Sequence, residues 1–105
     1  MSRNLRFFLE DIKESCEFII KYTKELTYDE FKADRRTTNE VVRELEIIGE
    51  AIKHIPNRIK DEHSEINWRD ITALRNVLVH FYFGINISLI WTTVQNEVRP
   101  LLANN

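Results

Sequence analysis

The stretch LRFFLEDIKESCEFIIKYTKEL, residues 5–26, decides the fold class. Its apolar side chains recur at steps of three and four residues, and charged side chains fill most positions between them. This period is typical of an α-helix with one stripe facing a core, and it predicts a helix from about Asn4 to Leu26. The inward stripe consists of Leu5, Phe8, Leu9, Ile12, Cys16, Ile19, Ile20 and Thr23.

The next part of the chain holds two segments with the spacing of a capping box, TYDE at 27–30 and TTNE at 37–40. In such a box the first and last side chains satisfy free backbone amides at a helix start. The first segment predicts a short helical turn, and the second predicts a helix that runs to about Ile55. Arg35 and Arg36 then fall in the connection between them.

The second half of the chain predicts two more helices. Residues 57–66 are polar, so we expect them to form the longest connection. Asn67 can cap the next helix, which Gly84 ends, and Asn86 or Ser88 begins the last one. The sequence therefore predicts an all-α fold, an up-and-down bundle of four main helices with a possible short extra helix.

The composition bounds the class of protein. With 105 residues, 43% of them hydrophobic and 30% charged, the chain suits one soluble domain, residues 1–105. Two Gly and two Pro leave too little turn material for a β-sandwich or barrel. A net charge of −2 provides no overall attraction to nucleic acid, so any contact with RNA has to be local.

The same composition bears on location. The single cysteine, Cys16, excludes an internal disulfide and suits a reducing compartment. Because it lies in the apolar stripe of the first helix, we interpret it as a small core residue and not a nucleophile. No secretory signal and no apolar run of about 20 residues is visible, so we expect a cytoplasmic protein without a membrane segment.

The segment RNVLVHFY, residues 75–82, holds four chemically capable side chains in apolar surroundings. On a regular helix Asn76 and His80 share a face, whereas Arg75 and His80 point about 140° apart. One regular helix therefore does not direct both at a single atom. Either the helix loosens before Gly84, or the same segment of a second copy completes the site across a two-fold axis.

These residue types suit RNA cleavage by internal transfer. Neutral His80 can accept the proton of a ribose 2′-hydroxyl, and charged His80 can donate one to the departing 5′-oxygen. Arg75 offers a planar donor fork for phosphate oxygens, and Asn76 can hold the His80 ring. The scheme requires no metal and no cofactor. From spacing alone, the same residues are also common as surface or capping groups, and Tyr82 as a half-buried aromatic.

The segment also resembles the R-x-x-x-x-H-x-Y signature of HepT-like toxins in the HEPN superfamily. Further landmarks occur along nearly the whole chain in the order that this family shows. They are Leu9-x-Asp11-Ile12, Phe31-x-x-Asp34, Ile48-Gly49-Glu50-Ala51, Trp68-x-x-Ile71, Trp91 and Pro100-Leu101. Glu50 belongs to one of them without an assigned role.

The resemblance implies an all-α homodimer whose two motifs face each other and cleave RNA without a metal. Arg75 and His80 are then catalytic and Asn76 is supportive. In this family the gene usually lies beside that of a minimal nucleotidyltransferase antitoxin, which transfers AMP from ATP to the motif tyrosine, here Tyr82. AMP on Tyr82 adds bulk and a negative charge beside Arg75, and both exclude an RNA phosphate.

Two other hypotheses remain at the level of the sequence. One is a non-enzymatic helical interaction module that binds a partner nucleotidyltransferase; the net acidic charge favours it, because nucleic-acid-binding domains are commonly basic. A binding module tolerates His80→Ala, whereas a nuclease does not. The other is a small-molecule hydrolase, which lacks a Ser or Cys nucleophile near His80.

Overall fold

The computed structural model describes residues 3–64, 67–73 and 87–100. Every regular element within these ranges is a helix, which confirms the predicted all-α class. The elements are α1 (Arg3–Thr23), α2 (Tyr28–Ala33), α3 (Arg35–Ile52), α4 (Asn57–Glu62), α6 (Ile87–Thr93) and the π-helical turn η1 (Val94–Val98). Residues 68–73 are also helical.

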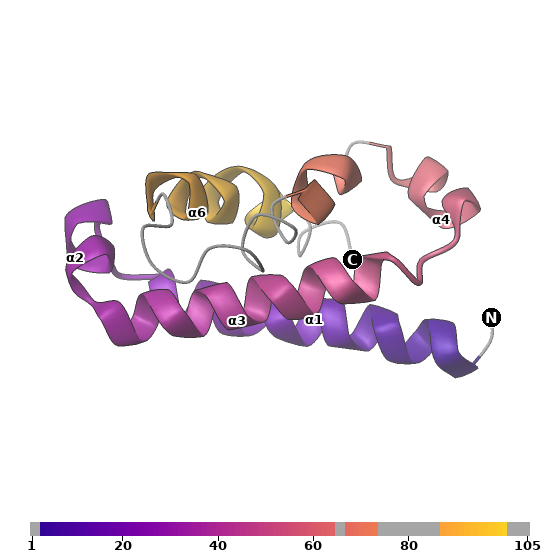
Figure 1. Ribbon diagram of the computed structural model, residues 1–105. Coiled ribbons are helices and arrows are strands. Elements are labelled where there is room, and N and C mark those ends of the chain that lie inside the picture. Colours follow the sequence, from indigo (N-terminus) through magenta and orange to yellow (C-terminus); the bar gives the residue numbers. More distant parts are fainter. Residues whose placement is uncertain (1–2, 65–66, 74–86, 101–105) are drawn as a thin grey trace.

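The helices form two layers. Figure 1 shows α1 and α3 side by side and antiparallel, with α2 at the end where the chain turns from one to the other. The second layer holds α6, η1 and the 68–73 helix, and η1 contacts α1 while α6 contacts α2. None of the helices in the described ranges combines the length and apolarity needed to span a membrane.

The core lies between these layers. The apolar stripe predicted for the first helix faces it, although α1 ends at Thr23 and not at Leu26. Cys16 is fully buried, and burial, followed by the negative charge of Glu17, raises the pKa of its thiol to about 12. The thiol therefore stays protonated, as expected of a core residue. The fully buried aliphatic side chains include Ile12, Ile19, Val41, Leu45, Ile48, Ile52, Ile90, Val94 and Val98.

The capping box at the start of α2 is confirmed. The Thr27 hydroxyl accepts a hydrogen bond from the Glu30 amide at 3.2 Å, and the Glu30 carboxylate accepts one from the Thr27 amide at 2.9 Å. The short helix that follows places Phe31 in the core, where its side chain is fully buried. This turn therefore fixes the corner between the two long helices.

The capping box predicted at residues 37–40 is wrong. Asp34 caps α3 instead, because its carboxylate accepts hydrogen bonds from the Thr37 amide at 3.1 Å and the Thr37 hydroxyl at 2.7 Å. These hydrogen bonds lower the pKa of Asp34. Arg35 and Arg36 consequently form the first turn of α3 and not a connection.

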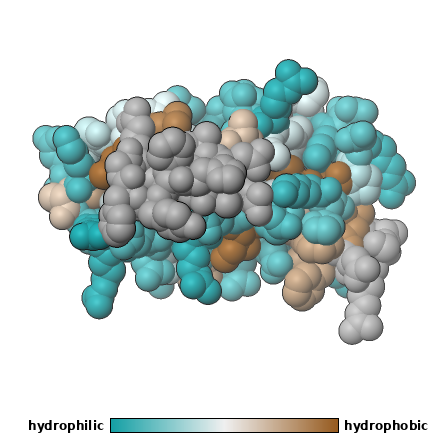
Figure 2. Space-filling model, viewed as in Figure 1, coloured by the Kyte–Doolittle hydropathy of each residue, from teal (hydrophilic) through white to brown (hydrophobic). Residues whose placement is uncertain are grey.

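The long connection predicted at residues 57–66 is also wrong in part. α3 ends at Ile52, before the predicted Ile55, and α4 occupies Asn57–Glu62 after Pro56 as its N-cap. Six helical residues with no buried member leave no apolar stripe for periodicity to detect. Figure 2 shows that the described surface on this face is largely hydrophilic, with small hydrophobic areas between the helices.

Candidate functional site

The four residues of the predicted site, Arg75, Asn76, His80 and Tyr82, lie outside the described residues, as does Gly84. The structure does describe the two segments that flank the motif in the chain. Residues 67–73 lead into the motif, and α6 with η1 follows it. Both flanking segments belong to the second layer.

The helix that leads into the motif is anchored at its start. The Asn67 side-chain oxygen accepts a hydrogen bond from the Asp70 amide at 3.3 Å, which confirms the predicted N-cap. The Asn67 side-chain amide also donates to the Asp70 carboxylate at 2.7 Å. The indole N–H of Trp68 donates to the carbonyls of Lys60 and His63 at 3.2 and 3.1 Å. The cap stabilises the first turn of this helix, and the indole ties the helix to the C-terminal end of α4.

The helix that follows the motif is anchored by apolar packing. Ile90, Val94 and Val98 are fully buried, and the Trp91 ring packs 5.1 Å from that of Phe31. The helix widens at η1, where the Arg99 amide donates to the carbonyl of Val94, five residues earlier. Such π-helical turns are rare and occur often at functional sites. Nothing in the hydrophobic pattern of the sequence signals this turn.

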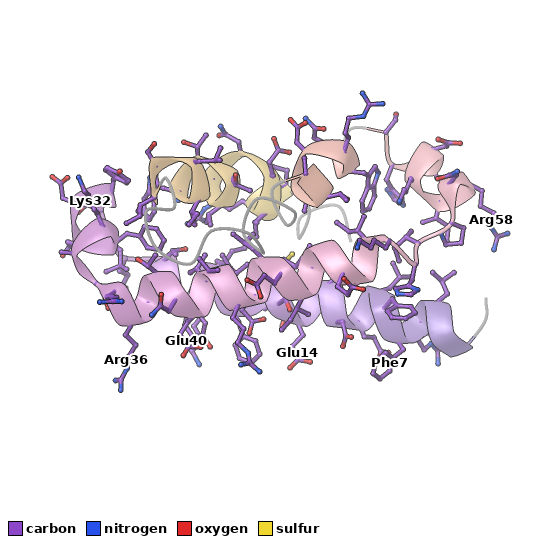
Figure 3. The ribbon with its side chains drawn as sticks, viewed as in Figure 1. Phe7, Glu14, Lys32, Arg36, Glu40 and Arg58 are labelled. Carbon is purple, nitrogen blue, oxygen red and sulfur yellow. The ribbon has the colours of Figure 1, made fainter. Side chains whose placement is uncertain are left out.

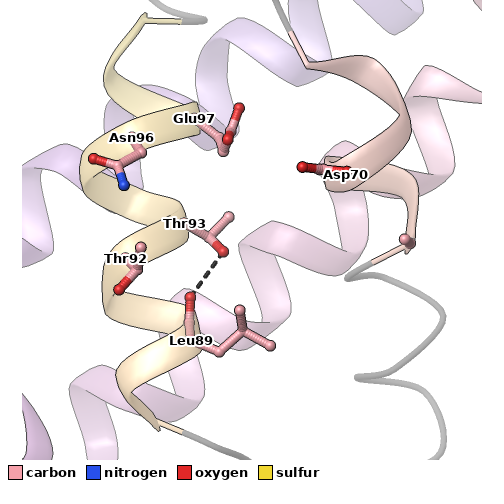
Figure 4. Close-up of a pocket in the computed structure, with 7 residues that line it drawn as sticks. Asp70, Leu89, Thr92, Thr93, Asn96 and Glu97 are labelled. Atoms are coloured by element: carbon pink, nitrogen blue, oxygen red, sulfur yellow. Dashed lines mark hydrogen bonds between the residues drawn. The ribbon is translucent and has the colours of Figure 1, made fainter.

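A pocket of about 340 Å³ lies between these two helices. Figure 4 shows Asp70 on the 68–73 helix pointing across the gap toward Glu97 on η1. The Thr93 hydroxyl is already used, because it donates to the Leu89 carbonyl at 2.8 Å. The residues that line the pocket are Asp70, Ala73, Leu89, Thr92, Thr93, Asn96 and Glu97.

The two carboxylates that line the pocket, those of Asp70 and Glu97, influence each other electrostatically. Partial burial, and then the negative charge of Asp70, raise the pKa of Glu97. Within the part of the chain that the structure describes, neither the Glu97 carboxylate nor the Asn96 amide makes a side-chain hydrogen bond. The sequence gives no signal for a pair of Asp70 and Glu97, because only the fold brings the two together.

Glu50, the landmark residue without a role, lies elsewhere. It is exposed on α3, and its carboxylate pairs with the ammonium of Lys53 at 3.7 Å. Exposed ion pairs of this kind contribute little to stability. The structure therefore places Glu50 on the surface of the long helix pair.

The structure shows an all-α protein, and in its sequence the predicted motif stands between the 68–73 helix and α6. A family model described as Ribonuclease HepT-like matches residues 12–104. The chain therefore belongs to the HepT-like ribonuclease family, as its motif and landmarks predicted.

Individual proteins that are similar to this chain also carry ribonuclease names. The "Probable ribonuclease HepT" of Thermococcus cleftensis is 43% identical over 101 residues, which cover 96% of this chain and 92% of the relative. A "Putative RNase" of Caldanaerobacter subterraneus is 41% identical over 96 residues, covering 91% and 86%. A "Putative RNase" of Methanocaldococcus jannaschii is 42% identical over 96 residues, covering 91% and 79%. No solved structure is significantly similar to this chain.

Proposed function

We propose that this protein is a metal-independent endoribonuclease and the toxin of a two-gene toxin–antitoxin pair. The observation that carries the proposal is the family match over residues 12–104, which includes the whole R-x-x-x-x-H-x-Y segment at 75–82. Relatives that align over nearly the whole chain carry ribonuclease names. Every residue of the motif is present, so nothing in the sequence marks an inactive copy.

The proposed reaction is an internal transfer at an RNA phosphate. His80 accepts the proton of the 2′-hydroxyl, and the 2′-oxygen attacks phosphorus while the bond to the 5′-oxygen breaks. A charged imidazolium returns a proton to the 5′-oxygen, so the products are a 2′,3′-cyclic phosphate and a 5′-hydroxyl. Arg75 stabilises the charge that gathers on the phosphate oxygens, and Asn76 orients the His80 ring.

The proposed site is composite. Because Arg75 and His80 diverge by about 140° on a regular helix, we assign each cleft one residue from each copy of a homodimer. An equal mixture of Arg75→Ala and His80→Ala chains, refolded together, tests this directly. A composite cleft regains activity in the mixed dimer, since one of its two sites is intact. Absence of any recovery rejects the composite site.

The proposed off-switch is Tyr82. A minimal nucleotidyltransferase antitoxin transfers AMP from ATP, so that the phenol oxygen attacks the α-phosphorus, pyrophosphate leaves and the phenolic proton goes to solvent. The bulk and negative charge of the adenylylated tyrosine then keep RNA phosphate away from Arg75. The intact mass of protein made with this partner rises by one AMP unit per modified tyrosine, and Tyr82→Phe removes the rise.

Growth of cells that express the protein alone tests the toxin role. We expect wild-type expression to arrest growth, and Arg75→Ala or His80→Ala to relieve the arrest while the variants keep their helical circular dichroism. If wild-type expression is harmless and the purified unmodified protein cuts no RNA, the proposal is wrong. Binding to a nucleotidyltransferase that survives His80→Ala would then favour a non-enzymatic interaction module.

A further inference from the structure

The pocket between the 68–73 helix and η1 has no role in the proposed chemistry, yet the chain ties it to the motif. Ala73 lines the pocket and lies two residues before Arg75. Two trans peptide units span at most about 7.6 Å between Cα atoms, whatever their conformation. The pocket therefore lies close to the motif along the chain.

The lining of the pocket defines the ligand chemistry that it can accept. Leu89 and Ala73 supply apolar surface, and the carboxylates of Asp70 and Glu97 face one another across the gap. A volume of about 340 Å³ lies at the lower end of the range for small-molecule sites, about 300–1,000 Å³. Two carboxylates repel a phosphate, so the favoured ligand is flat, partly apolar and rich in N–H donors.

We propose that this pocket binds a guanine base of the RNA substrate, with the Glu97 carboxylate accepting hydrogen bonds from the base N1–H and N2–H groups. The inference rests on the ribonuclease function proposed above. Guanine presents two neighbouring donors, which match the two oxygens of one carboxylate. Adenine and cytosine present a single amino group next to an acceptor, and uracil flanks its only N–H with two carbonyls, so each sets an acceptor against a carboxylate oxygen.

The two carboxylates have different tasks in this arrangement. The Asp70 carboxylate accepts a hydrogen bond from the Asn67 side-chain amide at 2.7 Å, which fixes the position of its charge. Glu97 is half-buried and its carboxylate makes no hydrogen bond within the described ranges, which leaves its oxygens available to a base. Burial and the charge of Asp70 raise the pKa of Glu97, and donors on a bound base relieve the same repulsion. The π-helical turn that carries Glu97 is a second sign of function here.

Mapping the cut ends of a random-sequence RNA pool tests the proposal. We expect wild-type protein to show guanine at one fixed position relative to the cut, and Glu97→Gln to lose that preference while still cutting. The matched control is Glu14→Gln, an exposed residue that points away from the second layer (Figure 3), and it keeps the guanine preference. No enrichment of guanine in the wild type, or the same enrichment in Glu97→Gln, overturns the proposal.

A substrate series makes the same test without a protein variant. Inosine lacks the N2 amino group of guanine, whereas 7-deazaguanine keeps both donors. At the enriched position we expect inosine to be cut about 10-fold or more slowly than guanine, because the half-buried Glu97 carboxylate loses a charged hydrogen bond. We expect 7-deazaguanine to be cut at the guanine rate. Equal rates for guanine and inosine reject the guanine pocket.

The two proposals fail in different ways. If Arg75→Ala cuts as fast as the wild type, the nuclease assignment fails. The base pocket is then decided by fluorescence anisotropy with labelled, uncleaved oligonucleotides that carry guanosine or inosine. Tighter binding of the guanosine oligonucleotide that disappears in Glu97→Gln supports the pocket, and equal binding of both oligonucleotides rejects it.

Discussion

The α1–α3 pair and the pocket between the 68–73 helix and η1 differ in where their charged side chains point. In the helix pair the charged side chains point outward; Figure 3 shows Glu14, Arg36 and Glu40 directed away from the second layer. The side chains that meet inside are apolar and fully buried, such as Ile19 and Ile48. At the pocket, two carboxylates point toward each other across a gap.

The difference separates a region that holds the fold from one that is available for binding. Apolar burial contributes about 25 cal/mol per Å² and supplies most of the stability of the frame. A half-buried carboxylate that faces another one works against stability, and proteins tolerate such conflicts chiefly at functional sites. Four measurements of reactivity and stability test this difference between the helix pair and the pocket.

The largest expected effect concerns Cys16 in the helix pair. Its thiol pKa rises from 9.0 to about 12, so its thiolate is about 1,000-fold scarcer than in an unshifted thiol. Maleimide should therefore label folded protein at least about 1,000-fold more slowly than protein unfolded in urea. Stopped-time labelling followed by mass spectrometry measures the ratio. Similar labelling rates in the folded and the unfolded protein would contradict the burial of Cys16 in the core.

Truncation of the same core has the next largest effect. Ile48→Ala empties a fully buried position on α3 and should cost about 2–5 kcal/mol of the free energy of unfolding. Its neighbour Ile47 is half-buried, so Ile47→Ala is the matched control and should cost clearly less. Urea titrations followed by circular dichroism give both values. Equal losses of stability at Ile47 and Ile48 would contradict the difference in burial between these two side chains.

Capping of the 68–73 helix gives a smaller change. Asn67→Ala removes the bond to the Asp70 amide and should cost about 1 kcal/mol. Asn57→Ala is the control, because α4 has Pro56 as its N-cap and no side-chain capping bond. The same urea titrations apply. If Asn57→Ala lowers the free energy of unfolding as much as Asn67→Ala does, the Asn67 cap does not stabilise the 68–73 helix.

The smallest effect has the opposite sign. The raised pKa of Glu97 means that this group ionises first in the unfolded chain as pH rises, so its own contribution to stability falls on going from acid to neutral pH. Glu97→Gln lacks this loss and should melt at a slightly higher temperature at pH 7. Below the ordinary pKa of glutamate the two proteins should melt together. A melting temperature that falls in Glu97→Gln at pH 7 contradicts repulsion in the pocket.

The sequence predicts the helix pair well because local physics sets it. Periodic apolar residues place Ile12 and Ile19 in the core, and the bonds that Thr27 and Asn67 make at helix starts were readable from residue type. α3 begins three residues before the predicted start because Asp34 takes the capping role from Thr37 and accepts two hydrogen bonds from it.

The pocket could not be read in the same way. Asp70 and Glu97 lie on helices that are distant in the sequence, and only the packing of the second layer sets them face to face. The π-helical turn depends on a backbone bond from Arg99 to Val94 that has no residue signature. The motif residues are the reverse case: the sequence selects Arg75 and His80, and their roles stay predictions.

The rate of RNA cleavage by purified, unmodified protein decides whether this chain is a ribonuclease that uses Arg75 and His80. The wild-type protein should cut a mixed-sequence RNA in the presence of a chelator and leave 2′,3′-cyclic phosphate ends. Arg75→Ala and His80→Ala should each reduce the rate at least about 100-fold, since one removes the phosphate donor and the other the acid–base group. Folded variants that cut at the wild-type rate, or a wild-type protein that cuts no RNA, would contradict the account.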